Sequence, residues 1–110
     1  MITSNSKTEI SIIEKLNQLN IPQHEKDLII ENGLRYRILE SENELKKIMS
    51  EIARLEKKLG NRFEELERIG LPDNADYKLH ENFMDLKALV YERLELKKRI
   101  ETLKQLFEME

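Results

Sequence analysis

The sequence predicts an all-α protein: an antiparallel coiled-coil helical hairpin with a short N-terminal helix and a short helix in the connector. Two long segments repeat apolar residues at alternating spacings of three and four, the pattern of a coiled-coil seam. Charged residues make up 37% of the 110 residues, with only 3 Gly and 2 Pro. Such a composition is typical of long, surface-rich helices. We expect a single helical domain over 1–110, divided into 1–22, 23–59, 60–76 and 77–110.

The first segment, residues 1–22, is expected to form a short amphipathic helix. Ile10, Ile13 and Leu16 recur at helical spacing, so they would share one face of that helix. Pro22 ends the segment, and it can also occupy the first turn of the next helix.

The helix expected over residues 23–59 contains the first seam. Its members are Leu34, Ile38, Ser41, Leu45, Ile48, Ile52, Leu55 and Leu59. Ser41 is the polar member of this series, and Gly60 is expected to end the helix, as a glycine at this position commonly does. Gly33 inside the helix costs about 1 kcal/mol relative to alanine, so it indicates either a close packing contact or a bend.

The last helix, expected over residues 77–110, repeats the same spacing. Its seam is formed by Leu79, Leu86, Leu89, Arg93, Leu96, Ile100, Leu103 and Phe107. Arg93 is the charged member. It either fixes the register of the two helices, or its stem crosses the seam and its charged end reaches water.

The connector, residues 60–76, is too long for a structureless turn in a compact domain, so we expect a short helix within it. Asn61 and Glu64 have the spacing of a capping pair at its start. The residues that would share one face of this helix are Phe63, Leu66 and Ile69. The last helix is expected to be capped by Asp73, Asn74 or Asp76. We expect the seams, rather than the connector, to provide the folding free energy.

A second apolar stripe is expected along one side of the hairpin. In the heptad numbering of the two seams it consists of Met49, Ala53, Phe83, Val90 and Leu94. Contiguous exposed apolar surface usually marks a contact, so something should cover this stripe. The connector helix, the N-terminal helix and another chain are the three candidates. Because a monomeric hairpin would leave such an apolar face exposed to water, we also expect a homo-oligomer.

Composition argues against several function classes. The chain has no cysteine, and His80 has only Asp76 and Glu81 near it, a weak pair where zinc needs three or four ligands. We therefore expect no metal site, no cofactor and no enzymatic activity, with His24 and His80 as surface residues. The net charge is -3, and residues 34–60 carry 7 basic and 5 acidic side chains interspersed, which indicates a solvated helix face rather than a nucleic-acid surface. Neither a leader peptide nor a membrane-spanning run is evident, so we expect a cytoplasmic protein.

The order of features from residue 34 to 105 resembles a family of small helical antitoxin-like proteins encoded beside toxin genes in prokaryotes. The matching stretch reads "EIARLEKKLGNRFEELERIGLPDNADYKLHENFMDLKALV". It contains a long charged helix that ends near a glycine, a short helix with an F-E-E-L start, a polar linker and an acidic-aromatic start to the last helix. Family members often have a tryptophan in this acidic-aromatic part, where this chain has Phe83 and Leu86.

The resemblance implies a non-catalytic antitoxin that binds and neutralises a cognate, basic toxin. The contact positions that it implies are Phe63, Leu66, Tyr77, His80, Phe83 and Leu86. The carboxylates of Glu81 and Asp85 would complement the basic surface of the toxin. The side stripe adds Met49, Val90 and Leu94 to the expected partner-binding residues. Two alternatives remain open at this point. One is a self-assembling structural coiled coil, and the other is a DNA-binding regulator that uses two short helices within residues 8–35.

Overall fold

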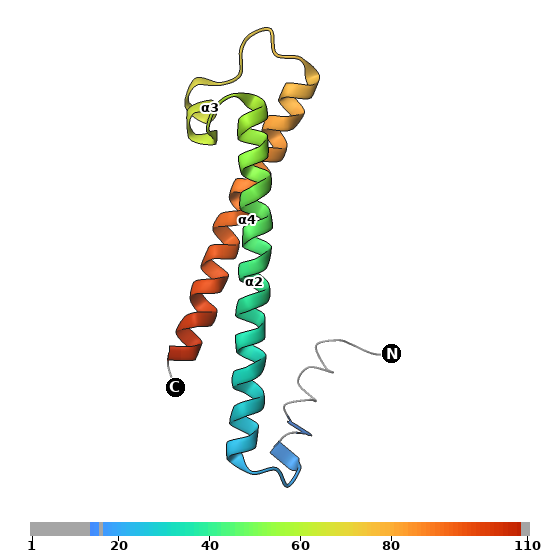
Figure 1. The fold of residues 1–110 in the computed structure, drawn as a ribbon, viewed down its shortest axis with the longest axis vertical. Coiled ribbons are helices and arrows are strands. Elements are labelled where there is room, and N and C mark those ends of the chain that lie inside the picture. Colours follow the sequence, from blue (N-terminus) through green and yellow to red (C-terminus); the bar gives the residue numbers. More distant parts are fainter. Residues whose placement is uncertain (1–13, 16, 109–110) are drawn as a thin grey trace. The chain divides into compact units, whose positions relative to one another are not determined.

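The computed structural model describes residues 14, 15 and 17–108; Ile10, Ile13 and Leu16 of the expected N-terminal helix lie outside this range. Helices α2 (Gln23–Leu59), α3 (Phe63–Ile69) and α4 (Tyr77–Glu108) follow in chain order (Figure 1). The described residues form no strand, and the predicted all-α fold is confirmed. Helix α2 begins and ends at the predicted residues. Within the described part of the chain, every helix is too short or too polar to cross a membrane.

The chain divides into two units, Met1–Tyr36 and Arg37–Glu110. Helix α2 runs through the boundary between them. All described side chains that are buried belong to the second unit. In the first unit, apart from the local backbone of α2, no atom of a described residue lies within 4 Å of the place where a side chain on Gly33 would begin. Gly33 is therefore not a close packing contact.

The second unit is an antiparallel hairpin formed by α4 and the part of α2 after residue 36 (Figure 1). Its core is formed by Ile48, Ile52, Leu55, Phe63, Leu66, Leu86, Leu96 and Ile100. Both predicted seams contribute to this core, so the hairpin prediction is confirmed. An ion pair between Lys104 Nζ and Glu42 Oε2, 3.1 Å apart, joins the C-terminal part of α4 to α2.

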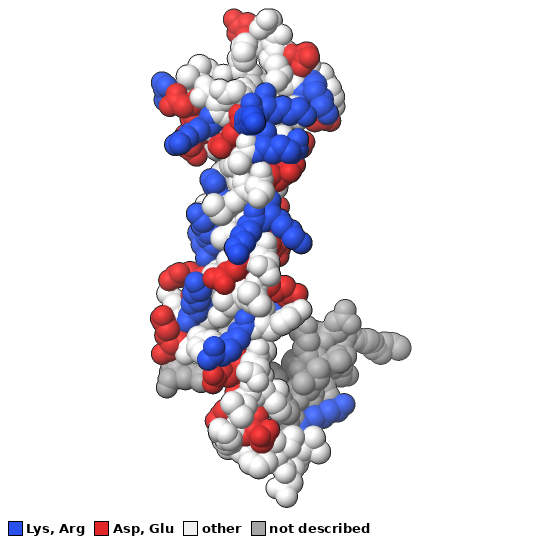
Figure 2. Space-filling view, in the orientation of Figure 1, with Lys and Arg blue, Asp and Glu red and all other residues white. Residues whose placement is uncertain are grey.

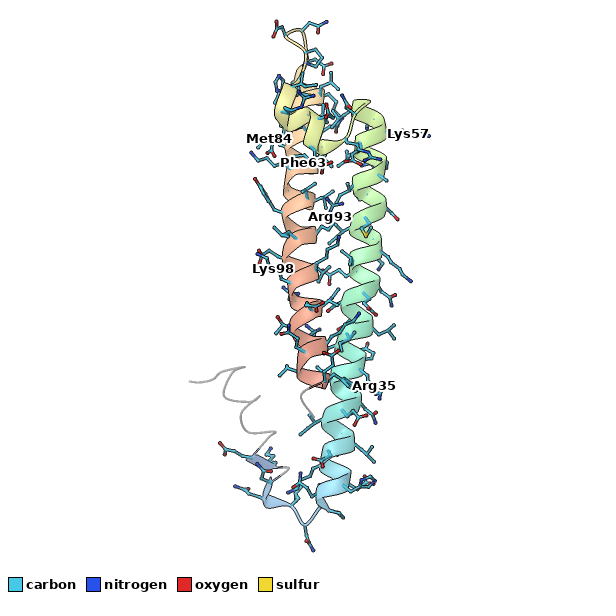
Figure 3. All side chains as sticks on the ribbon, turned by 90° about the vertical axis from the view of Figure 1, so that its left-hand side faces the viewer. Arg35, Lys57, Phe63, Met84, Arg93 and Lys98 are labelled. Carbon is cyan, nitrogen blue, oxygen red and sulfur yellow. The ribbon has the colours of Figure 1, made fainter. Side chains whose placement is uncertain are left out.

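Polar side chains interrupt the seam at three positions. Ser41 is buried, as its place in the first series predicted. Asn82 is also buried, although the predicted series stepped from Leu79 to Leu86 and left it out. A step of three residues from Leu79, followed by a step of four to Leu86, would have included Asn82 in the series. Arg93 is half-buried and lies between α2 and α4 (Figure 3), which agrees with a stem that crosses the seam.

Asn82 gives the first testable prediction. Its side chain is 6% exposed, and its carboxamide makes no hydrogen bond to another described residue. Burying a polar group without a partner costs roughly 1–3 kcal/mol, so Asn82→Leu is expected to raise the free energy of unfolding by about 1 kcal/mol or more. Urea unfolding followed by circular dichroism measures this change.

The matched control for this substitution is Asn43→Leu, which makes the same change at an exposed position of α2. It reports the gain from helix propensity alone, which is a fraction of a kcal/mol. A loss of stability in Asn82→Leu would contradict the expectation, because it would mean that the carboxamide is well solvated or hydrogen-bonded in the folded protein.

The turn after α2 is built around Gly60. Its φ is 81°, a left-handed conformation that glycine adopts without steric cost, and the Asn61 N–H donates to the Glu56 carbonyl at 3.1 Å. The predicted capping pair of Asn61 and Glu64 is wrong, because Glu56 takes that role. Its Oε2 accepts a hydrogen bond of 2.9 Å from the Phe63 N–H at the start of α3. Once Gly60 reverses the chain, the Glu56 carboxylate lies beside the helix N-terminus, which favours negative charge.

The start of α4 is capped by Asp76, one of the three predicted candidates. Asp76 Oδ1 accepts a hydrogen bond of 2.9 Å from the Leu79 N–H. This bond satisfies one of the N–H groups that a helix N-terminus leaves without a partner within the helix. It also fixes the position of the first turn of α4, which contains Tyr77 and His80.

Candidate protein-binding surface

The connector helix α3 covers part of the expected side stripe. Phe63 is 5% exposed, and its ring stacks on Phe83 with the centroids 6.0 Å apart and an interplanar angle of 22°. Phe83 and Val90 both pack against the core, whereas Ile69 of α3 points into solvent. Helix α3, one of the three candidates for the cover, therefore contacts the stripe at Phe83.

The rest of the side stripe stays open in the second unit. Met49 and Leu94 are each about half exposed, and Ala53 is exposed as well. These residues do not contribute to the buried core. They remain an apolar surface on which a further contact can form.

Three of the expected partner-binding residues lie in the core rather than on the surface. Phe63 and Leu66 are buried because α3 packs back onto the hairpin. Leu86 is 0% exposed because it occupies a central seam position of α4. Their side chains are therefore not part of an exposed contact surface.

Four other expected residues lie together on α4. Tyr77, His80, Glu81 and Asp85 line a shallow hollow with a volume of about 280 Å³, and Met84 completes it. They share one side of the helix because residues three, four, seven and eight positions apart are neighbours on its surface. Sequence reasoning missed Met84. Its position seven residues after Tyr77 was the signal that could have identified it.

The charges around this hollow are mainly acidic. Glu81 Oε1 lies 3.4 Å from Lys78 Nζ, whereas Asp85 makes no ion pair with another described residue. Both carboxylates are exposed, as is His80. The hollow thus combines an aromatic ring, a thioether and two carboxylates within about two helical turns.

A second shallow groove adjoins the hollow. Its volume is about 330 Å³, and it is lined by Glu51, Arg54, Leu55, Asp85, Ala88 and Leu89. Asp85 belongs to both depressions, so they form one continuous surface from α4 to α2. In the groove, Arg54 Nε donates to Glu51 Oε1 at 3.1 Å, and this hydrogen bond lowers the pKa of the Glu51 carboxyl.

Three large side chains continue the hollow along α4. Tyr77, Met84 and Tyr91 are 81%, 59% and 53% exposed, and we call them the outer row. They are spaced by seven residues, about two helical turns, so they form one line along the helix. Figure 3 shows Met84 pointing away from α2. The outer row therefore lies on the solvent side of the hairpin.

The fold and this surface define the class of the protein: an all-α helical hairpin with an exposed aromatic and methionine row beside an acidic hollow. No group of three or more His, Cys, Asp or Glu side chains within residues 14–15 and 17–108 has the geometry to hold a metal ion. No family model, curated protein or solved structure matches the chain.

Proposed function

We propose that this protein is a non-catalytic protein-binding module and that the outer row and the hollow of α4 form its contact surface. The observation that carries the proposal is the exposure of Tyr77, Met84 and Tyr91 in one line along α4. A helix whose opposite side is already packed in a core can present such a line without reorganisation.

The chemistry of the surface fits a protein partner. Tyrosine and methionine are enriched in the centres of protein interfaces, and methionine adapts its shape to the surface that it meets. Carboxylates at the edge of an interface speed the encounter with a basic partner. Glu81 and Asp85 occupy that position at the hollow. The partner that fits is therefore a basic protein with an apolar segment.

The particular form that we propose is an antitoxin that acts in the cytoplasm. Its resemblance to antitoxin-like proteins over residues 34–105 supports this form. A basic toxin would be neutralised by occlusion, because a bound helical hairpin covers its active surface. Such a mechanism requires no catalytic group in this chain.

A self-assembling coiled coil is the second candidate. The half-exposed side chains of Met49 and Leu94 favour it, because pairing of two copies would remove them from water. Light scattering distinguishes the two candidates. A monomer at micromolar concentration would argue against self-assembly, and a stable oligomer that retains the outer row in its interface would argue against the partner-binding surface.

The direct test is co-expression with the product of the neighbouring reading frame, followed by co-purification and kinetic measurement of binding. Tyr77→Ala and Met84→Ala are expected to raise the dissociation rate by about tenfold or more, which corresponds to roughly 1.4 kcal/mol or more. Charge reversal at Glu81 and Asp85 is expected to slow association and to weaken its dependence on salt.

Tyr36→Ala is the matched control, because Tyr36 is an exposed tyrosine of α2 outside the proposed surface. It is expected to leave both rates unchanged. The antitoxin form is wrong if the neighbouring product is harmless when it is expressed alone. The protein-binding surface is wrong if the neighbour binds Tyr77→Ala and Met84→Ala as tightly as the natural chain.

A further inference from the structure

Helix α2 carries a second exposed surface that differs in chemistry from the outer row. Its basic residues between 46 and 58, which we call the lysine face, are Lys46, Lys47, Arg54, Lys57 and Lys58. An α-helix turns by about 100° per residue, so all five lie within a sector of roughly 120°. In Figure 2 blue side chains gather over the upper half of α2, and in Figure 3 Lys57 points away from α4.

Of the four lysines, Lys58 interacts electrostatically with Glu51 and helps to lower the pKa of that carboxyl. Among the described residues, none of these lysines makes an ion pair. Two nearby carboxylates are engaged elsewhere: Glu51 with Arg54, and Glu56 with the Phe63 N–H. Glu44 remains as an exposed carboxylate at the edge of the face. Of the other cations of the second unit, Arg37, Arg68, Lys78, Lys98 and Lys104 pair with carboxylates. Five more make no ion pair with a described residue: Arg62, Lys87, Arg93, Lys97 and Arg99.

The side chains between the cations indicate the class of ligand. Asn43 and Ser50 are exposed on the same side of α2, and no large apolar residue lies among them. A protein interface needs an apolar or aromatic centre, and a membrane-surface helix needs an apolar face to insert. Lysine, arginine, serine and asparagine are the side chains that contact the phosphates and sugars of nucleic acids.

The length of the face fits several phosphates of one strand. Lys46 and Lys57 are eleven residues apart, which corresponds to about 16 Å along the helix at 1.5 Å per residue. Phosphates of one strand of DNA follow each other at about 3.4 Å along the duplex axis, so the face spans roughly five of them. The face has no aromatic side chain on which an unpaired base could stack, and this favours a duplex over a single strand.

We propose that the lysine face binds the phosphate backbone of double-stranded DNA without reading its base sequence. Lys57 and Met84 point away from the hairpin on opposite sides (Figure 3), so DNA bound at Lys57 leaves Met84 accessible, whereas Arg54 borders the groove beside the hollow of α4. This inference goes beyond the proposed protein-binding function and does not depend on it. Basic and acidic side chains alternate along residues 34–60, so their numbers alone do not reveal the lysine face. On the helix the two kinds of side chain lie on different sides.

The experiment uses the full chain and a fluorescein-labelled duplex of about 20 base pairs, with binding followed by anisotropy between about 50 mM and about 200 mM KCl. Four to five phosphate contacts predict that the logarithm of the affinity falls with the logarithm of the salt concentration with a slope of about -4. The double variant Lys46→Gln and Lys47→Gln is expected to bind more weakly and to make this slope shallower by about 1.8.

The matched control is the double variant Lys97→Gln and Lys98→Gln, which removes the same charge from two adjacent exposed lysines of α4. It is expected to keep the slope of the natural chain, and circular dichroism verifies that both variants are folded. Several results would overturn the proposal: no binding at about 50 mM KCl, an equal loss in both double variants, or tighter binding of a single strand. Tighter binding of vesicles that contain phosphatidylglycerol would also overturn it.

Discussion

Leu86→Ala is expected to lower the free energy of unfolding by about 2–5 kcal/mol, the range for large-to-small changes in a packed core. The Leu86 side chain is 0% exposed, and residues of α2, α3 and α4 form the core cluster around it. Truncation removes its buried apolar surface and leaves a cavity that the surrounding helices can fill only in part. Urea unfolding followed by far-ultraviolet circular dichroism measures the loss.

Leu106→Ala is the matched control, since Leu106 lies on the same helix and is about half exposed. It is expected to change the stability by about 0.5 kcal/mol or less, the usual limit for surface substitutions. Equal effects of the two substitutions would contradict the packing described for the second unit, because Leu86 would then not be more buried than Leu106 in solution.

Phe63→Ala is expected to be about as damaging, with a loss of about 3–5 kcal/mol. The sequence led us to expect that the seams, rather than the connector, provide the folding free energy. The burial of Phe63 and its stacking on Phe83 are the reason for the different expectation. An aromatic pair adds roughly 0.5–1.5 kcal/mol to the free energy of apolar burial. Thermal and urea unfolding of the variant test this value.

Two further variants separate the stacking from the burial. Ile69→Ala changes an exposed residue of the same short helix and is expected to have little effect. A double-mutant cycle of Phe63→Ala with Phe83→Ala is expected to give a coupling energy of about 0.5–1.5 kcal/mol. A coupling near zero, or a loss below about 1 kcal/mol in Phe63→Ala, would mean that α3 is not docked on the hairpin in solution.

The three helices, the end of α2 and the start of α4 could be derived from the sequence because their causes are local. The spacing of three and four places Ile48, Ile52 and Leu55 on one side of α2, whatever the rest of the chain does. Gly60 ends α2 because a left-handed residue is needed there, and Asp76, the residue just before α4, caps the first turn of that helix. These interactions join residues within about one or two helical turns, so the order of residues along the chain already specifies them.

The candidate site was only partly predictable. Tyr77, His80, Glu81 and Asp85 lie in one hollow as neighbours on one helix, which follows from their spacing. Phe63, Leu66 and Leu86 were expected in a partner interface but lie in the core, because the packing of α3 on the hairpin decides which apolar side chains remain exposed.

Interactions between elements required the folded chain. The Glu56 carboxylate reaches the Phe63 N–H, and Phe63 stacks on Phe83, because the turn at Gly60 brings α3 back onto the hairpin. The spacing of residues along one helix cannot specify such contacts, since they depend on the direction in which the next helix leaves the turn. The separation of the lysine face on α2 from the outer row on α4 has the same origin. Each surface follows from helical geometry, but their placement on opposite sides is set by the seam that packs the two helices together.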